Sequence, residues 1–166
     1  MDSLFHSTIM ALTDFLSKDD QNRISEAIAN AEKCTSGEIC VHVTPKCSGE
    51  VMKVAEKTFN KLGLYKTERR NAVLIYVAYK SKKFAILGDQ GINDRVPANY
   101  WQQEKDSLGK FLSEGKPGDG LCEVVRQIGD ALSSVFPPVD NDLDELSNEV
   151  SYAEADEQAA DGRRLR

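Results

Sequence analysis

Residues 69–96 read RRNAVLIYVAYKSKKFAILGDQGINDRV, and this stretch decides the fold. It holds two apolar runs, 72–78 and 83–88, which are separated by the polar turn 79–82. Two such runs joined by a short turn are typical of a buried strand hairpin. Polar residues and glycines stand before the first run and after the second, where a hydrophobic core would not require them. We therefore expect any chemistry of the protein to lie at these two places.

Upstream of the hairpin, the sequence predicts a helix over residues 18–32. Ser17 is a typical helix N-cap, and Asp20 stands three residues later, in the place of the glutamate of a capping box. Apolar side chains then recur every three or four residues, as on the buried face of a helix. The segment Thr35-Ser36-Gly37 is rich in turn-forming residues and ends this helix.

Between this helix and the hairpin, the sequence predicts a strand and a second helix. Residues 38–44 form a short strand, because β-branched side chains alternate along it at Ile39, Val41 and Val43. The second helix begins at about residue 51 and is stopped by Gly63.

Two further helices follow the hairpin. Pro97 suits the first turn of the third helix. Residues 115–120 form a glycine- and proline-containing loop, and the last helix covers residues 121–135, which carry the most regular apolar stripe of the chain.

This order of elements predicts a single α/β domain with a mixed β-sheet, a β-α-β unit plus a hairpin, sandwiched by helices. The β-α-β unit is expected to be parallel and right-handed, and the hairpin strand antiparallel to its neighbour. We assign residues 17–139 to this domain, residues 1–16 to an N-terminal segment and residues 140–166 to an acidic C-terminal tail. We expect disorder from about Ala153.

The topology brings three polar clusters that are distant in sequence to one edge of the sheet. The first two strands begin at this edge and the third ends there, so residues 35–38, 69–71 and 88–91 should meet. Ligands of open parallel sheets usually bind at the opposite edge, beyond the carboxyl ends of the strands. That edge offers few converging polar groups, so we predict that the edge with the three clusters is the functional one.

Composition and charge restrict the class of protein. The tail holds nine of the 27 acidic side chains and three of the 21 basic ones, so the domain itself is neutral. A neutral domain with an acidic tail argues against nucleic acid as a partner. No segment reads as a membrane span or a signal peptide, so we expect a cytoplasmic protein, and we expect it to be a monomer. The four cysteines should then be free thiols.

The polar clusters resemble signature blocks of the TPM domain family, in the same order. The blocks are Thr35-Ser36-Gly37-Glu38-Ile39, Arg70-Asn71 with its apolar strand, Gly88-Asp89-x-Gly91-Ile92, Phe136-Pro137 and residues 145–149. The family name joins a thylakoid lumen protein, a photosystem II repair protein and an acetylcholine-receptor auxiliary protein. The resemblance covers residues 17–150 and implies an α/β sandwich. Some relatives are described as phosphatases, sometimes metal-binding, and others as repair factors or receptor accessories, so the resemblance leaves the function open.

Asp89 is the strongest candidate for a functional side chain. A carboxylate between glycines on a strand-end loop suits a hard cation such as Ca²⁺ or Mg²⁺. Glu38 and Asp94, with Asn93, could add oxygen ligands. The alternative is a turn in which the glycines supply positive φ angles and Asp89 is only a cap.

The other candidates would bind a phosphate group. Arg70 could grip a phosphate through two hydrogen bonds, or it could pair with Glu38 or Asp89 across the sheet edge. Thr35, Ser36 and Asn71 could bind the same substrate, but Thr35-Ser36-Gly37 is also an ordinary helix stop. Cys40 and His42 lie on one face of their strand, where packing is a better explanation than nucleophilic catalysis.

Two functional hypotheses follow from these residues. The first is a weak divalent-metal-dependent phosphatase, in which Asp89 holds the cation and Arg70 orients a phosphorylated substrate. The second is a non-catalytic domain for protein binding, assembly or repair, whose partner is an unidentified protein.

Overall fold

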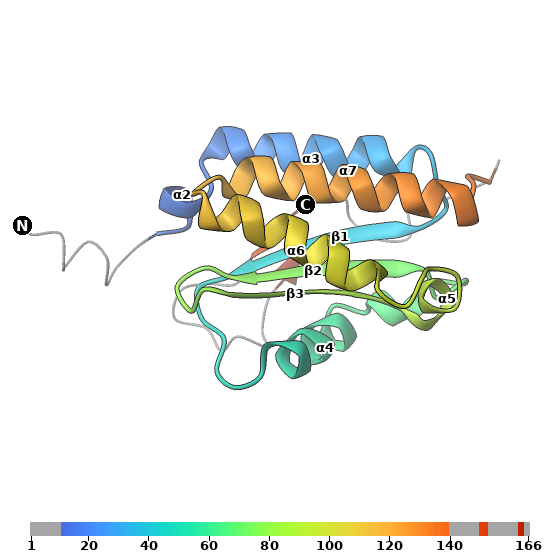
Figure 1. The fold of residues 1–166 in the computed structure, drawn as a ribbon, viewed down its shortest axis with the longest axis horizontal. Helices are drawn as coiled ribbons and strands as arrows, with labels where there is room; N and C mark the ends of the chain where they lie inside the picture. The colour runs from blue at the N-terminus through green and yellow to red at the C-terminus, as the bar shows by residue number, and fades with distance from the viewer. Residues whose placement is uncertain (1–10, 140–149, 153–162, 165–166) are drawn as a thin grey trace, which may run out of the picture.

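The computed structural model describes residues 11–139, 150–152 and 163–164, and Figure 1 shows their elements. They form one α/β domain around a mixed sheet, as the sequence predicts. Strand β1 (Glu38–Thr44) is central, and β2 (Ala72–Ala78) runs parallel beside it. Strand β3 (Lys83–Gly88) is antiparallel to β2, and this pair forms the predicted hairpin. The full order is β3-β2-β1-β4-β5, in which β4 is Ser151–Tyr152 and β5 is Arg163–Arg164.

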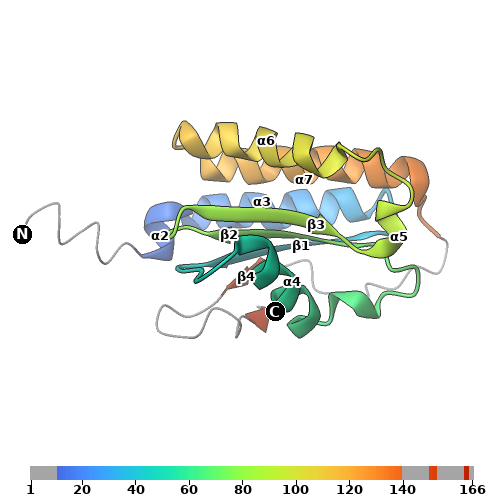
Figure 2. The ribbon, with the colours of Figure 1, turned by 60° about the horizontal axis from the view of Figure 1, so that its bottom comes forward.

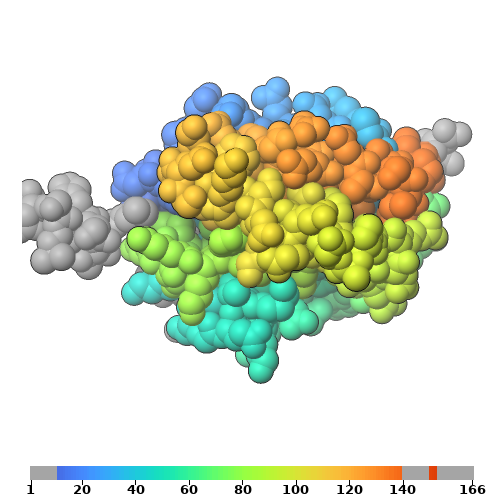
Figure 3. All heavy atoms as spheres, in the orientation of Figure 1, coloured from blue at the N-terminus to red at the C-terminus, as the bar shows by residue number. Residues whose placement is uncertain are grey.

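Helices cover both faces of the sheet. One face carries α3 (Lys18–Glu32), α6 (Tyr100–Ser113) and α7 (Pro117–Val135), and the other carries α4 (Val51–Lys61) with the short turn η1 (Leu64–Lys66). Figure 2 shows these two layers on either side of the strands. In the space-filling view, α6 crosses the surface between α7 and the β2–β3 hairpin (Figure 3). The remaining helices, α2 (Leu12–Phe15) and α5 (Gln90–Asn93), are one turn each.

The alternation of side chains along the strands produces two separate hydrophobic cores. The core beneath α3, α6 and α7 takes the β-branched residues Ile39, Val41, Val43, Val73, Ile75 and Val77. The core beneath α4 takes the residues between them, including Cys40, Leu74 and Tyr76. Successive side chains of a strand point to opposite faces, so a single strand register fills both cores. A slip by one residue would move each set of side chains to the wrong face.

The predicted ends of several elements are confirmed. The hydroxyl of Ser17 accepts a hydrogen bond of 3.0 Å from the Asp20 amide and caps α3. Gly63 follows α4 with a φ of 72°, a left-handed conformation that glycine adopts without steric cost. The first two strands have the predicted bounds.

The last helix begins earlier than the sequence predicts. Residues 115–120 are expected to be a loop, but α7 starts at Pro117 and includes Gly118 and Gly120 of that segment. A Cβ atom on Gly120 would lie 2.5 Å from the Cβ of Phe111, and one on Gly118 would overlap the carboxylate of Asp20. The prediction is wrong there because these glycines allow α7 to pack closely against α6 and α3, and that packing outweighs their low helix propensity.

The third helix also differs, because it starts at Tyr100. Pro97 only accepts a hydrogen bond from the Tyr100 amide in the preceding turn, at 3.0 Å.

Parts of both terminal segments belong to the packed domain. Leu16, which we assigned to the N-terminal segment, is fully buried in the core. Ser151 and Tyr152, which we assigned to the acidic tail, form β4 and pair with His42 and Val43 of β1. Except for residues 163–164, the region for which we expect disorder lies outside the described residues.

Candidate functional site

The three polar clusters meet at one edge of the sheet, as predicted. Glu38 is in register with Ala72, and Val73 is in register with Gly88. The Glu38 amide donates a hydrogen bond of 3.2 Å to the Asn71 carbonyl, and the Asp89 amide donates one of 2.9 Å to the Ala72 carbonyl. We call the edge formed by residues 35–38, 69–71 and 88–91 the amino edge, because β1 and β2 begin there.

Arg70 and Asp89 form an ion pair at the amino edge. The Nε atom of Arg70 lies 2.7 Å from Oδ2 of Asp89, and Nη2 lies 2.9 Å from Oδ1. The Asp89 side chain is 6% exposed, whereas that of Arg70 is 41% exposed. Hydrogen bonding to Asp89 raises the pKa of Arg70, which keeps the guanidinium charged. Of the two explanations for Arg70, the structure supports pairing across the sheet edge, and Asp89 is the partner.

Asp89 is also a helix cap. Its Oδ1 atom accepts a hydrogen bond of 2.8 Å from the Gln90 amide at the start of α5. The loop approaches the preceding strand closely, since the Gly91 amide donates to the Arg70 carbonyl at 2.9 Å. A Cβ atom at residue 91 would lie 2.7 Å from that carbonyl oxygen, so only glycine fits. The capping part of the alternative therefore describes this segment, but the part that gives the glycines positive φ angles is wrong, because neither Gly88 nor Gly91 has one.

The predicted phosphate-binding residues are connected to one another and to the end of α7. The Ser36 hydroxyl accepts hydrogen bonds from Arg69 Nη1 at 3.1 Å and from Asn71 Nδ2 at 3.4 Å. The Thr35 hydroxyl donates to the Phe136 carbonyl and accepts from the Gly37 amide. Thr35 and Asn71 are buried, and Arg69 is exposed. This network ties the amino edge together and leaves the Arg69 guanidinium at its surface.

The predicted metal ligands do not assemble into a cation site in this arrangement. Both oxygens of Asp89 accept hydrogen bonds from Arg70, and Glu38 is buried. Asp94 is exposed at the far end of α5. Within the described residues, no group of three or more His, Cys, Asp or Glu side chains is placed to hold a metal ion. Ca²⁺ and Mg²⁺ prefer several oxygen ligands, and these residues do not offer them together.

Sequence reasoning missed Trp101 of α6, which supports the Asp89 loop through Asn93, a residue predicted only as a possible metal ligand. The indole Nε1 of Trp101 donates a hydrogen bond of 2.7 Å to Asn93 Oδ1, and Asn93 Nδ2 donates one of 3.2 Å to the Gly88 carbonyl. The Trp101 ring occupies the space where a Cβ atom on Gly88 would lie. A tryptophan on a helix gives no sequence signal for a partner on a distant strand.

His42 has a structural role, as the packing explanation for the Cys40–His42 pair implies. Its Nδ1 atom lies 2.9 Å from the Ser151 hydroxyl of β4. Its ring stacks on Tyr76 at a centroid distance of 5.7 Å, and His42 is fully buried. This arrangement holds β4 against β1.

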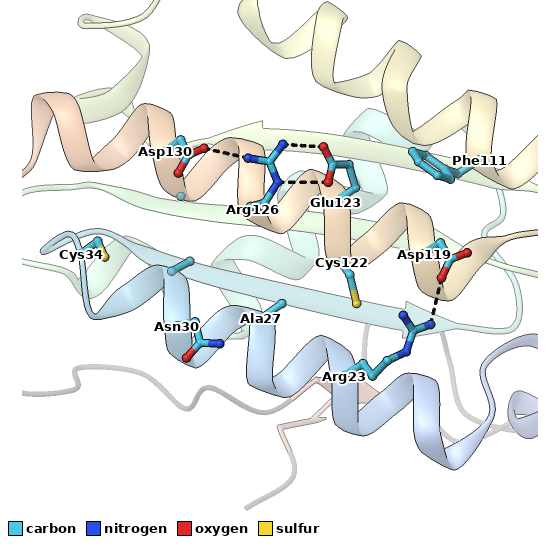
Figure 4. Close-up of a pocket in the computed structure, with 12 residues that line it drawn as sticks. Arg23, Ala27, Asn30, Cys34, Phe111, Asp119, Cys122, Glu123, Arg126 and Asp130 are labelled. Carbon is cyan, nitrogen blue, oxygen red and sulfur yellow. Dashed lines mark hydrogen bonds and ion pairs between the residues drawn. The ribbon is translucent and has the colours of Figure 1, made fainter.

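A separate hollow lies between α3 and α7, away from the amino edge (Figure 4). Its volume is about 630 Å³, and Ala27, Ala31 and Gly129 are among its lining residues. The arginines on its walls are paired: Arg23 contacts Asp20 and Asp119, and Arg126 contacts Glu123 and Asp130. These pairs are charges at the helix surface, and such exposed pairs contribute little to stability.

The comparisons with known proteins agree with this fold. The model of the TPM domain family matches residues 9–131, so the chain belongs to the TPM domain family. The NMR structure of the BA42 protein from the psychrophilic bacterium Bizionia argentinensis is 36% identical, with a TM-score of 0.80 over 87% of this chain and 100% of that one. The N-terminal domain of cg2496 from Corynebacterium glutamicum is 15% identical, with a TM-score of 0.60 over 81% of this chain and 84% of that one, and this likeness concerns the fold alone.

No curated protein matches the sequence at a significant level. Within the described residues, no helix is both long enough and apolar enough to cross a membrane.

Proposed function

We propose that this TPM domain is a non-catalytic binding domain that captures a phosphorylated partner at its amino edge. The observation that carries this proposal is the double hydrogen bond between Arg70 and Asp89. It orients the Arg70 guanidinium while 41% of that side chain stays exposed. A guanidinium has five N–H donors, of which Arg70 uses two on Asp89, so the others can serve a ligand.

Arg69 adds a second exposed guanidinium at the same edge. It donates to the Ser36 hydroxyl at 3.1 Å, and this contact places it beside the loop that begins β1. Two arginines held by neighbouring side chains suit a phosphate monoester, since guanidinium groups bind phosphate oxygens through paired hydrogen bonds. In this role Asp89 positions Arg70 and does not itself contact the ligand.

A metal-dependent phosphatase is the second candidate, and the closeness of Arg70 to Asp89, though not the hydrogen bonds between them, supports it. The carboxylate and the guanidinium assigned to that reaction are side by side. This candidate needs a different state of the edge, in which the Asp89 carboxylate is not held by Arg70.

The test is a titration of isotope-labelled protein with O-phosphoserine, with serine as the control ligand, followed by amide NMR. We expect phosphoserine to shift the amides of residues 35–37, 69–71 and 89–91. Arg69→Gln should weaken binding about fivefold, the effect of one partly solvated charge contact. Arg126→Gln, which removes a surface arginine on α7, is the matched control and should leave binding unchanged.

A hydrolysis assay separates the two candidates. The full chain is incubated with 4-nitrophenyl phosphate in the presence and absence of Mg²⁺ or Ca²⁺. Binding of phosphoserine without turnover supports the binding domain. Turnover that requires the cation and is lost in Asp89→Asn would replace it with the phosphatase.

A further inference from the structure

A cavity of about 580 Å³ opens at the edge of the sheet opposite the amino edge. It is formed where β2 ends and β3 begins, and it includes Val77, Tyr79 and Phe84. The other walls come from α2 and from the end of α6 with the turn into α7. Figure 3 shows these three segments converging at one end of the molecule, the hairpin in green, α2 in blue and the end of α6 in gold.

Aromatic rings form part of the walls of this cavity. The rings of Phe15 and Tyr79 stack nearly parallel, with a centroid distance of 5.2 Å and an interplanar angle of 13°. Phe84 and Leu112 line the same space, and both are only partly buried. The volume is in the range of small-molecule sites, which are mostly apolar with a few polar groups that orient the ligand.

The charges around the opening are mainly positive. Lys82 and Lys83 line the cavity, against a single carboxylate, that of Asp14. The Asp14 carboxylate lies at the start of α2, where its Oδ2 atom accepts a hydrogen bond of 3.0 Å from the Ala11 amide. The Lys83 ammonium donates to the Gly49 carbonyl at 3.0 Å, which holds it there, and Lys82 is the more exposed of the two lysines. The Lys105 ammonium adds positive charge nearby, 5.8 Å from the centre of the Phe84 ring.

Lys82 occupies a position that would favour glycine. Its φ is 54°, in the left-handed region that non-glycine residues adopt at a cost. Its side chain is exposed, so packing does not require a lysine there. The turn therefore accepts an unfavourable backbone conformation while it presents a positive charge at the mouth of an aromatic cavity.

We propose that this cavity binds a small aromatic carboxylate, with the ring between the aromatic walls and the carboxylate at Lys82. The rings of Phe15, Tyr79 and Phe84 provide apolar surface for a planar ring, which favours stacked or edge-on contacts with them. The cavity also lies at the carboxyl end of β2, where α/β sheets usually bind their ligands. It is distant along the strands from the Arg70–Asp89 pair, so it does not depend on the function proposed for the amino edge.

The test is an amide NMR titration of the full chain with 2-naphthoate, and with 2-naphthalenemethanol as the uncharged ligand of the same ring size. We expect 2-naphthoate to shift residues 15, 79, 82–84 and 112 and to bind at least fivefold more tightly than the alcohol. Lys82→Gly should weaken 2-naphthoate binding about fivefold. Glycine suits a positive φ, so this variant should fold at least as well as the wild type.

Lys80→Gly is the matched control, because it removes a lysine from the same turn that does not line the cavity. It should leave the affinity for 2-naphthoate unchanged. If the cavity residues show no shifts up to about 10 mM ligand, the proposal is overturned, because binding that weak has a free energy too small for a specific site. Equal binding of the acid and the alcohol, or equal weakening by both lysine variants, would overturn it as well.

Discussion

Arg70 and Asp89, which are separated by 18 residues along the chain, are joined by two hydrogen bonds of 2.7 and 2.9 Å at the amino edge of the sheet. The carboxylate is buried and the guanidinium is half exposed, so the pair connects the packed end of β3 with the solvent. The contact between Arg70 and Asp89 therefore belongs both to the packing of the fold and to the candidate site.

Replacing Asp89 by asparagine should lower the free energy of unfolding by about 2 kcal/mol, because hydrogen bonds to a charged group are removed at a buried position. Chemical denaturation measures this decrease. Asp94→Asn is the control, since Asp94 is exposed at the end of α5, and it should change stability by less than about 0.5 kcal/mol. Equal stability of the two variants would show that the ion pair does not hold the loop.

Gly88→Ala should destabilise the protein by about 2 kcal/mol, because the new methyl group would overlap the Trp101 ring. The added cost should be much smaller in a Trp101→Leu background, in which the overlapping ring is absent. A double-mutant cycle by denaturant unfolding measures this coupling. Additive effects of the two substitutions would contradict the close contact between α6 and the end of β3.

Ser151→Ala should lower stability by about 1 to 3 kcal/mol, the cost of removing one partner of a buried hydrogen bond. The Ser151 hydroxyl lies 2.9 Å from Nδ1 of His42, and an alanine side chain cannot form this hydrogen bond. Hydrogen exchange should also become faster at Val43, which pairs with Tyr152 of β4. Unchanged exchange at Val43 would mean that β4 is held by other interactions.

Glu104 should make the protein less stable as the pH rises. Burial raises the pKa of this carboxyl group, and nearby Glu123 adds to the effect, while Tyr100 and Arg126 oppose it. Between the pKa of the unfolded chain, about 4.3, and the raised pKa of the folded state, the folded form holds more protons. The neutral carboxyl group therefore contributes its full stability below the pKa of the unfolded chain. This contribution is lost as the pH rises through the raised pKa of the folded state.

Glu104→Gln should remove this pH-dependent destabilisation, so that its stability relative to the wild type increases from pH 4 to pH 7 in urea unfolding. Glu123→Gln is the opposite case. Hydrogen bonding to Arg126 lowers the pKa of Glu123 to about 2, so its charged form is favoured in the folded protein, although the exposure of the pair keeps this contribution to stability small. The two variants should thus diverge as the pH rises, and a parallel pH dependence would contradict the burial of Glu104.

Most of the fold could be predicted from sequence because its signals are local. The Ser17 cap, the stop at Gly63 and the alternation along 38–44 and 72–78 each depend on residues within one element. The start of α7 could not be predicted, because Gly118 and Gly120 read as loop residues unless Asp20 and Phe111 are known to lie beside them. Strand β4 was missed for a related reason, since two residues give no periodic pattern and its pairing with β1 spans about a hundred residues.

The candidate site, like the fold, could be predicted only in part. Topology alone predicted that residues 35–38, 69–71 and 88–91 would meet, because strand direction fixes which ends share an edge. The sequence left open whether Arg70 binds phosphate or pairs with Glu38 or Asp89, and the hydrogen bonds of the structure select Asp89. The cavity beside Tyr79 could not be predicted either, because Phe15 falls in the segment assigned outside the domain and its contact with Tyr79 depends on the tertiary fold.

The short strand β4 has a consequence for the surface of the sheet. It pairs with only His42 and Val43, while the Glu32 carboxylate accepts a hydrogen bond of 2.8 Å from the Ile39 amide farther along β1. Unpaired strand backbone is a template for another chain to add to. A chain that ends at residue 139 would expose the backbone of His42 and Val43 and is expected to associate with a second copy through strand addition. Strand β4 thus covers the backbone of His42 and Val43, which another chain could otherwise pair with.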